Sequence, residues 1–334
     1  MIRNLGIFFA VCVFGIMAMS QTNSNQQTST SANGAAQNWI AISNGYATLL
    51  TNVAFQYHPE AGSQQGLSQY DNKVGQPTLA DEDRERAETE AVLVKLQAAT
   101  KEKQQPQVAE DLQIMISRVQ LNFKMQDYQR AHEVPFLNAS QVVFVGLHSL
   151  LDVQTPNERR PAAVVRIREY AGIDPGYTPI TEILKQRVKE QMAKPGVIYP
   201  ARVQIETEMA RNSNYLDGIA TLMEKYKLTG WQDSYATLKK QLVDYDDWVR
   251  ETVLPKARAD FRMPREKYEL ALENYGIDIP PEQIAAMAHQ AFTEIQGEMK
   301  SVTAQIAKER NLPSSDYRDV MHELKKQQLV GDAI

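Results

Sequence analysis

The sequence predicts an all-α fold, a large multi-helical array of long amphipathic helices. Apolar residues recur at intervals of three and four along several segments, as one face of a helix requires. Strand signals are scarce: the stretch QVVFVGLHSLL at 141–151 has a β-branched run, but periodicity alone cannot separate a strand from a buried helix there, and we favour helix. With 334 residues and 43% hydrophobic content, the chain can bury a core in one large domain or two modest ones.

Residues 1–20 have the layout of a secretory signal peptide. Arg3 precedes the apolar run Leu5–Met17, and the small residues Ala18 and Ser20 follow it. The run is shorter than the roughly 20 apolar residues that span a membrane, so we expect cleavage after Ser20 rather than a retained anchor. The sequence therefore predicts export to the periplasm or the cell exterior, with no stable membrane span after processing.

Residues 21–38 are predicted to form a flexible polar spacer. They are rich in Gln, Asn, Ser and Thr and have few large apolar side chains that could repay the entropy of ordering. The only cysteine, Cys12, lies inside the export segment, so the processed chain would form no internal disulfide.

The helical part is predicted to begin near Trp39, in a helix that Pro59 ends. The clearest later helix starts at Pro280-Pro281 and has the apolar stripe Ile284, Met287, Ala288, Ala291, Phe292, Ile295, Met299, Val302 and Ile306. A second stripe consists of Val108, Leu112, Met115, Ile116, Val119 and Phe123. Both stripes are interpreted as core. Further helices are expected at 81–99, 178–193, 201–227 and 231–253, with turns at Pro175-Gly176, Pro195-Gly196 and Gly230.

Charge and motifs exclude several function classes. The net charge is -5 and no basic block could follow a phosphate backbone, so nucleic acid is not an expected partner. The chain lacks a G-x-S-x-G elbow, a phosphate-binding loop and a G-x-G-x-x-G fingerprint.

The histidines do not form a zincin motif, in which a second histidine one helical turn after His-Glu completes a zinc site. Phe136 stands four residues after His132, and Lys326 stands four after His322. The i, i+3 pair Asp319 and His322 has no Glu-x-x-His elsewhere to match it, so we treat its spacing as chance. No metal or catalytic residue is predicted in this chain.

Two stretches resemble the domain of unknown function 885 family. FQYHPEAGSQQGLSQYD has that family's N-terminal signature at Phe55, Pro59, Gly66, Leu67, Tyr70 and Asp71. The segment that begins LPKARADFRMP is similar to the family's central section at Pro255, Asp260, Phe261, Tyr268 and Pro281. The resemblance runs from about Trp39 to the end and covers the N-terminal part of the family's usual length, so we interpret residues 39–334 as an incomplete, N-terminal helical part.

The resemblance implies a zincin-like metallopeptidase whose catalytic H-E-x-x-P-G-H motif lies in its C-terminal half. This chain has no such motif, because Asn138 stands six residues after His132 and Gln328 six after His322. The chain is thus expected to be a non-catalytic portion that acts with the missing C-terminal half, and zinc is expected only in a full-length member. Peptides are the implied substrates, and the signature residues are interpreted as structural.

Two other hypotheses remain open. The chain could be a naturally short, exported helical protein that binds a partner or has a structural role. It could also be a complete enzyme that uses His132, Glu133 and His148, which bound zinc would reveal. Asp71 is expected to cap the following helix or to pair with a cation.

Overall fold

The computed structural model describes residues 32–326, so the predictions for the signal peptide and for most of the spacer lie outside the described residues. The described residues are 73% helical and form no strand, only the isolated bridges Glu133–Ile198 and Ala201–Arg258. The all-α prediction is therefore confirmed. No helix in the described part of the chain is both long and apolar enough to cross a membrane.

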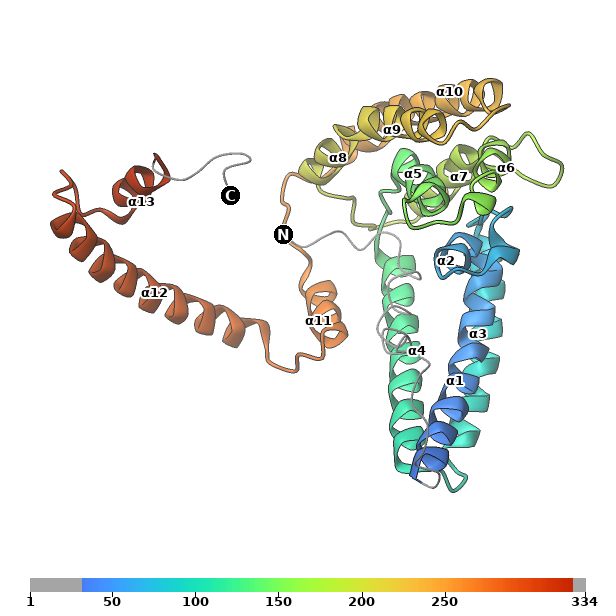
Figure 1. Cartoon of the computed structure of the whole chain (residues 1–334), viewed down its shortest axis with the longest axis horizontal. Coiled ribbons are helices and arrows are strands. Elements are labelled where there is room, and N and C mark those ends of the chain that lie inside the picture. Colours follow the sequence, from blue (N-terminus) through green and yellow to red (C-terminus); the bar gives the residue numbers. More distant parts are fainter. Residues whose placement is uncertain (1–31, 327–334) are drawn as a thin grey trace. The chain divides into compact units, whose positions relative to one another are not determined.

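Three long helices form the first layer: α1 (Ala32–Tyr57), α3 (Leu79–Ala99) and α4 (Pro106–His132), which pack on one another (Figure 1). Their shared core includes Ala47, Leu96, Val108 and Leu112. The stripe predicted from Val108 to Val119 is therefore buried as expected, while its last member, Phe123, is half-buried. α1 begins at Ala32, inside the predicted spacer 21–38, where the alanine-rich segment favours helix.

A short connection follows α1 and bears most of the N-terminal signature. It consists of α2 (Pro59–Gln64) and the 3₁₀ turn η1 (Ser68–Tyr70), which pack on each other, and α2 also contacts α5 of the second layer. The chain then enters α3 with Thr78 as its N-cap, where the Thr78 hydroxyl accepts a hydrogen bond from the Asp81 backbone N–H at 3.1 Å.

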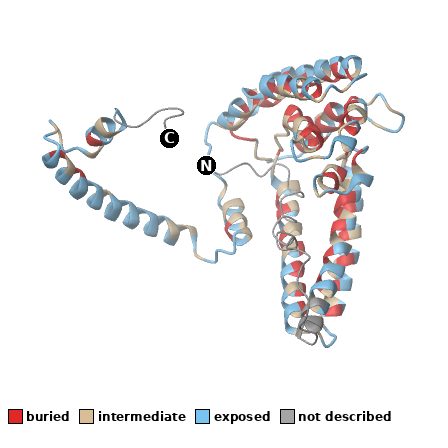
Figure 2. Ribbon diagram, in the orientation of Figure 1, coloured by how far each residue is buried: buried red, intermediate tan, exposed pale blue. Residues whose placement is uncertain are grey.

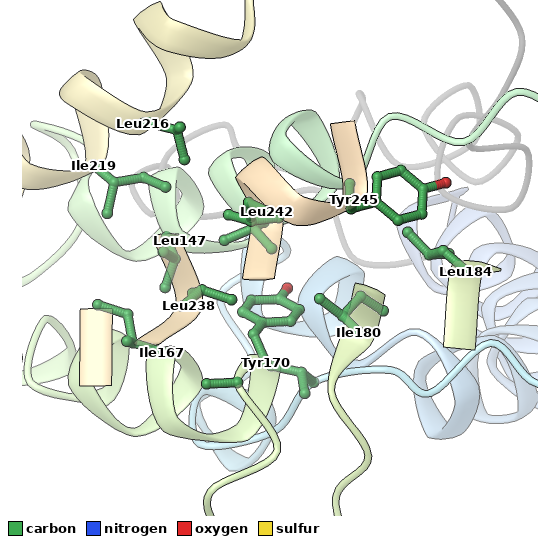
Figure 3. Packing of buried hydrophobic residues seen from close by; sticks show 14 of the residues in the cluster. Leu147, Ile167, Tyr170, Ile180, Leu184, Leu216, Ile219, Leu238, Leu242 and Tyr245 are labelled. Atoms are coloured by element: carbon green, nitrogen blue, oxygen red, sulfur yellow. The ribbon is translucent and has the colours of Figure 1, made fainter. Parts of the chain in front are cut away.

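The second layer surrounds α5 (Ala139–Leu151), which confirms the helix favoured for 141–151. Its other members are α6 (Ala162–Tyr170), α7 (Ile180–Met192), α9 (Asn212–Lys225) and α10 (Gln232–Trp248). Figure 3 shows side chains from these helices meeting in one core, with Leu147 and Tyr170 among them. This core and that of the first layer are separate apolar clusters.

The single helix predicted at 201–227 is wrong, because the structure has α8 (Arg202–Met209) and then α9, which begins at Asn212. The Asn212 side chain is buried and donates to both carboxylate oxygens of Asp246 at 2.9 Å, while its own oxygen accepts from the Asn138 amide at 2.8 Å. These side-chain hydrogen bonds hold Asn212 at the start of α9. The sequence next to Asn212 contains no Gly or Pro that would have predicted the break between α8 and α9.

The helix predicted at 231–253 changes form near its end. α10 stops at Trp248, and the chain continues as the π-helical turn η3 (Val249–Val253) and the 3₁₀ turn η4 (Leu254–Lys256). Pro255 accounts for the change, because its ring would clash with the carbonyl four residues earlier in a regular α-helix. The predicted turns at Gly176, Gly196 and Gly230 are all present, with positive φ values of 88°, 70° and 77°.

The chain divides into two compact units after Arg262, a boundary that none of the predicted turns marks. The second unit contains α11 (Arg265–Asn274), α12 (Pro281–Glu309) and α13 (Tyr317–Lys326). The stripe of α12 was predicted to be core, and this was wrong within that unit. Phe292 is 64% exposed and Ile295 56%. Figure 2 shows α12 exposed along most of its length. In the second unit α13 packs on α12, and Thr303 and Ala307, which lie beside the stripe, are buried.

Leu147 provides a test of the second-layer core. Leu147→Ala should lower the free energy of unfolding by about 2–5 kcal/mol, because it removes a fully buried side chain and leaves a cavity. Val153→Ala, at a 76% exposed position, should change it by less than about 0.5 kcal/mol. Urea unfolding followed by tryptophan fluorescence measures both, since all three tryptophans, Trp39, Trp231 and Trp248, lie in the first unit. Equal effects would contradict this packing.

Candidate functional site

The N-terminal signature residues lie within one short stretch between α1 and α3. Phe55 is buried near the end of α1, and its ring meets that of Tyr70 edge-on at 5.8 Å. Pro59 begins α2, and Gly66 adopts a φ of +89°, a conformation that favours glycine. Gly66 and Leu67 are the exposed members of the set. The signature thus forms a tight, packed reversal of the chain.

Asp71 is the ionic centre of this reversal. Arg159, in the turn η2 (Asn157–Arg159), binds both of its oxygens, Nε to Oδ2 at 2.8 Å and Nη2 to Oδ1 at 2.6 Å. The Ser63 hydroxyl also donates to Oδ1 at 2.7 Å, and Arg159 Nη2 donates to the Ser63 carbonyl. Burial raises the pKa of Asp71, but the bonds from Arg159 and Ser63 outweigh burial and hold the pKa below its usual value. Of the two expected roles, Asp71 therefore has that of pairing with a cation.

A second arginine ties the same segment to the second layer. Arg166 in α6 is completely buried, and its guanidinium donates to the carbonyls of Gly146 in α5 and of Tyr70. The bond to Tyr70 measures 3.2 Å. The sequence analysis did not single out Arg166. Its spacing could have indicated burial, because Arg166 lies four residues from both Ala162 and Tyr170, on the apolar face of its helix.

Glu60 of α2 links the two layers through a tyrosine. The Tyr170 hydroxyl donates to Glu60 Oε1 at 2.7 Å, and the Gly75 backbone N–H donates to the same oxygen at 3.0 Å. Gly146 makes room for this contact, since a Cβ at that position would lie 2.0 Å from the Tyr170 hydroxyl oxygen. We call Asp71, Arg159, Arg166, Glu60 and Tyr170 the ionic joint.

Glu169 lies beside the ionic joint at the end of α6 and is buried, with only 5% of its surface exposed. Burial raises the pKa of its carboxyl to about 7, and Asp174 and Glu60 add to the rise, while Tyr177 and Arg166 oppose it. Its Oε2 atom has no hydrogen-bond partner among the described residues. The carboxyl is consequently half-protonated near neutral pH.

His58 is the N-cap position of α2 and contacts α3. Its Nε2 atom lies 3.1 Å from both carboxylate oxygens of the buried Glu85. Burial lowers the pKa of His58, but the hydrogen bond and charge of Glu85 prevail and raise it. This pair is a further polar contact between α2 and the first layer.

The residues that are similar to the family's central section lie outside the N-terminal signature segment. Pro255 is in η4, Asp260 is exposed with its Oδ1 atom accepting from the Arg262 backbone N–H, and Phe261 is 71% exposed. Tyr268 lies in α11 of the second unit and is half-buried. Pro255, Asp260 and Phe261, which lie in the first unit, share no described hydrogen bond or ion pair with the ionic joint.

A pocket of about 350 Å³ lies in the second unit beside α13, lined by Leu312, Pro313, Ser314, Asp319, Val320, His322, Glu323 and Lys326. Asp319 accepts a hydrogen bond from the Ser314 hydroxyl at 2.6 Å. Among the described residues, no three His, Cys, Asp or Glu side chains come together in a way that could hold a metal ion.

The fold and the ionic joint define an all-α protein in which a short signature segment is fastened between two helical layers. The family described as "Bacterial protein of unknown function (DUF885)" matches residues 59–332, and the chain belongs to this family. The match includes the signature from Pro59 to Asp71, and Phe55 precedes it. No curated protein matches this chain significantly.

The Asp71–Arg159 pair should be important for stability. Asp71→Asn leaves the largely buried Arg159 guanidinium without its counter-charge, so the free energy of unfolding should fall by about 3 kcal/mol. Asp127→Asn breaks an exposed pair with Arg86 and should cost no more than about 1 kcal/mol. Urea unfolding at pH 7 measures both. If Asp71→Asn costs no more than Asp127→Asn, the ionic joint is not what fastens the layers.

Glu169→Gln should change how stability depends on pH. The folded protein binds the Glu169 proton up to about pH 7, whereas the unfolded chain releases it near 4.5, so this group's stabilising contribution is lost as pH rises between those values. Glutamine has no proton to lose. The variant should therefore match the parent near pH 4.5 and exceed it in stability at pH 8.

Thermal unfolding from pH 4.5 to 8 tests this expectation, with Glu224→Gln at an exposed position of α9 as the control. The control should follow the parent throughout. If the unfolding temperatures of Glu169→Gln and the parent differ by the same amount at every pH, Glu169 is not a buried group that titrates in this range.

Proposed function

We propose that this chain is the N-terminal, non-catalytic portion of an exported zinc metallopeptidase that acts on peptides. The observation that carries the proposal is membership of the DUF885 family over residues 59–332, in a chain without an H-E-x-x-P-G-H motif. In this proposal the export signal is the segment 1–20, and the protein works in the periplasm or outside the cell.

A scaffolding role suits the chemistry of the ionic joint. The carboxylates and guanidinium groups of Asp71, Arg159 and Arg166 are engaged with one another and with backbone carbonyls, which favours a fixed arrangement of helices over proton transfer. Rigid helical layers are the kind of support that holds one wall of a substrate groove.

The chemistry itself would belong to the missing C-terminal half, which we propose as the partner of this chain. Zinc would be bound there, by a motif with two histidines that meet one ion while a glutamate activates water. The residues described here would help to position a peptide and would supply no ligand.

The exposed stripe of α12 favours one alternative, a naturally short, exported helical protein that binds a partner or has a structural role. Apolar faces of this length on a soluble protein mark interaction surfaces. In this alternative, the chain would have the scaffold of the family without its catalytic half.

The intact mass of the native protein distinguishes the proposed larger peptidase from the naturally short binding protein. Denaturing mass spectrometry of the protein captured from its source cells, with an antibody against residues 39–334, should give a mass well above 37.7 kDa if the proposal is right. A mass equal to this chain less residues 1–20 would instead support the short binding protein.

Zinc content provides a second test, on the purified 334-residue chain. We expect well below one equivalent of zinc and no cleavage of peptide substrates, because the zinc-binding motif is absent. One equivalent of zinc together with peptidase activity would overturn the proposal and support a complete enzyme built on His132, Glu133 and His148.

A further inference from the structure

The loop that joins α6 to α7, residues 172–178, follows directly on the buried end of α6, and we call it the strap. The base of the strap is fixed, because Gly172 lies so close to Pro179 that a Cβ on Gly172 would be 2.4 Å from Cδ of Pro179. Gly172 and Gly176 have positive φ values of 67° and 88°, which allow the chain to reverse within this short loop. The part of the strap beyond this base is held by other contacts.

The side chain of Gln76 holds the strap from outside. Its Nε2 atom donates to the Gly176 carbonyl at 3.1 Å, and its Oε1 atom accepts from the Thr178 backbone N–H at 2.9 Å. Both hydrogen bonds are exposed to solvent, where water can replace them at little cost. The strap can therefore be released from Gln76 without unfolding of α6 or α7.

Tyr177, which lies between the two residues that Gln76 binds, connects the strap to Glu169. The Tyr177 ring is half-buried against the core of the second layer, and its hydroxyl donates to the Glu169 carboxylate. Glu169 is buried, and its Oε2 atom has no hydrogen-bond partner among the described residues. The strap thus contributes a direct polar contact to a carboxyl group that is otherwise poorly solvated.

The charged groups that face Glu169 do not compensate a negative charge there. Glu60 of α2 and Asp174 of the strap are acidic and disfavour the charged form, whereas Arg166 of α6 favours it. Arg166 donates to backbone carbonyls, so its hydrogen bonds are directed elsewhere. α5 and α10 also pack on α6, and they present uncharged groups to it, the Gly146 carbonyl and the Gln241 amide.

We infer that the strap is a pH-sensitive closure of the first unit, which opens when Glu169 loses its proton and closes when Glu169 is protonated. Opening lets water reach the carboxylate, which is costly to keep buried, in exchange for the exposed bonds to Gln76 and the contacts of Tyr177. The helices around the strap keep their packing. This inference concerns the first unit alone and does not rest on the proposed peptidase function.

The direction of the pH response follows from the two states of the strap. The closed form keeps the Glu169 proton up to a pKa of about 7, whereas a solvated glutamate releases it near 4.5. The open form therefore becomes more populated as the pH rises between these values, and its population levels off above pH 7. Because one proton changes the ratio of the two forms by at most about tenfold per pH unit, we expect the open fraction to rise roughly 10- to 100-fold from pH 5 to pH 7.

Hydrogen exchange of the full chain, followed by mass spectrometry, tests the closure. The reporters are the backbone amides of Tyr177 and Thr178, which donate to the Asp174 carbonyl and to Gln76. After correction for the intrinsic exchange rate at each pH, their protection should fall by about tenfold or more from pH 5 to pH 7. The amides of α5 should be protected more strongly than the reporters at both pH values, because the strap opens while the second layer stays folded.

Two variants and a control separate the parts of this switch. In Glu169→Gln the protection of the reporters should be the same at both pH values, whereas the control Glu224→Gln, at an exposed position of α9, should respond to pH as the parent does. Gln76→Ala should lower the protection of Tyr177 by a similar factor at pH 5 and pH 7, since it removes the outer bonds and leaves Glu169 in place.

Three results would overturn the inference. The first is reporter protection that does not change with pH in the parent, and the second is a pH response that persists in Glu169→Gln. The third is protection of the reporters equal to that of α5, because Glu169 would then reach water only when the whole layer unfolds.

Discussion

The bidentate contact between Arg159 and Asp71, together with the buried Arg166, is the constraint on which the first unit depends. The two layers have separate apolar cores, one around Leu96 and Leu112 and the other around Leu147. Between them, the signature segment is held by charged hydrogen bonds to η2 and α6. Apolar packing stabilises each layer, and the ionic joint fixes the signature segment on η2 and α6.

Apolar packing and ion pairing have different roles here because they differ in how strictly they fix geometry. Apolar burial is non-directional and tolerates sliding, whereas a guanidinium that meets a carboxylate through two bonds accepts one geometry. A buried ion pair adds little net stability compared with well-packed apolar residues, because both charges lose their hydration. The contribution of the Asp71–Arg159 pair is therefore to specify how α2 and η1 lie on α5 and α6. Glu169 shows the cost of burying polar groups here, because one of its carboxylate oxygens has no hydrogen-bond partner among the described residues.

The sequence predicted the helices better than the site. Periodicity located α4 and α12, because these segments have strong local patterns. At 141–151 periodicity could not decide, and the helix favoured there is present as α5. It joined α8 to α9 because the break depends on Asn212 and Asp246, residues distant in sequence. For the site, the resemblance pointed to Asp71, but Arg159 lies far along the chain and belongs to no motif. Pairings of this kind arise from the tertiary fold, so local patterns do not reveal them.

The stripe of α12 shows what periodicity can and cannot establish. The α4 stripe and the α12 stripe both predicted buried faces, and only the former is buried in its own unit. The difference lies in the width of the stripe: α4 also buries Leu121, Met125 and Tyr128 and contacts both α1 and α3, whereas the α12 pattern narrows to one apolar residue every three or four after Ala291. A wide face fits a layer of several helices, and a narrow stripe fits fewer neighbours. An apolar stripe thus predicts that a face will be covered, while its width indicates how many helices cover it.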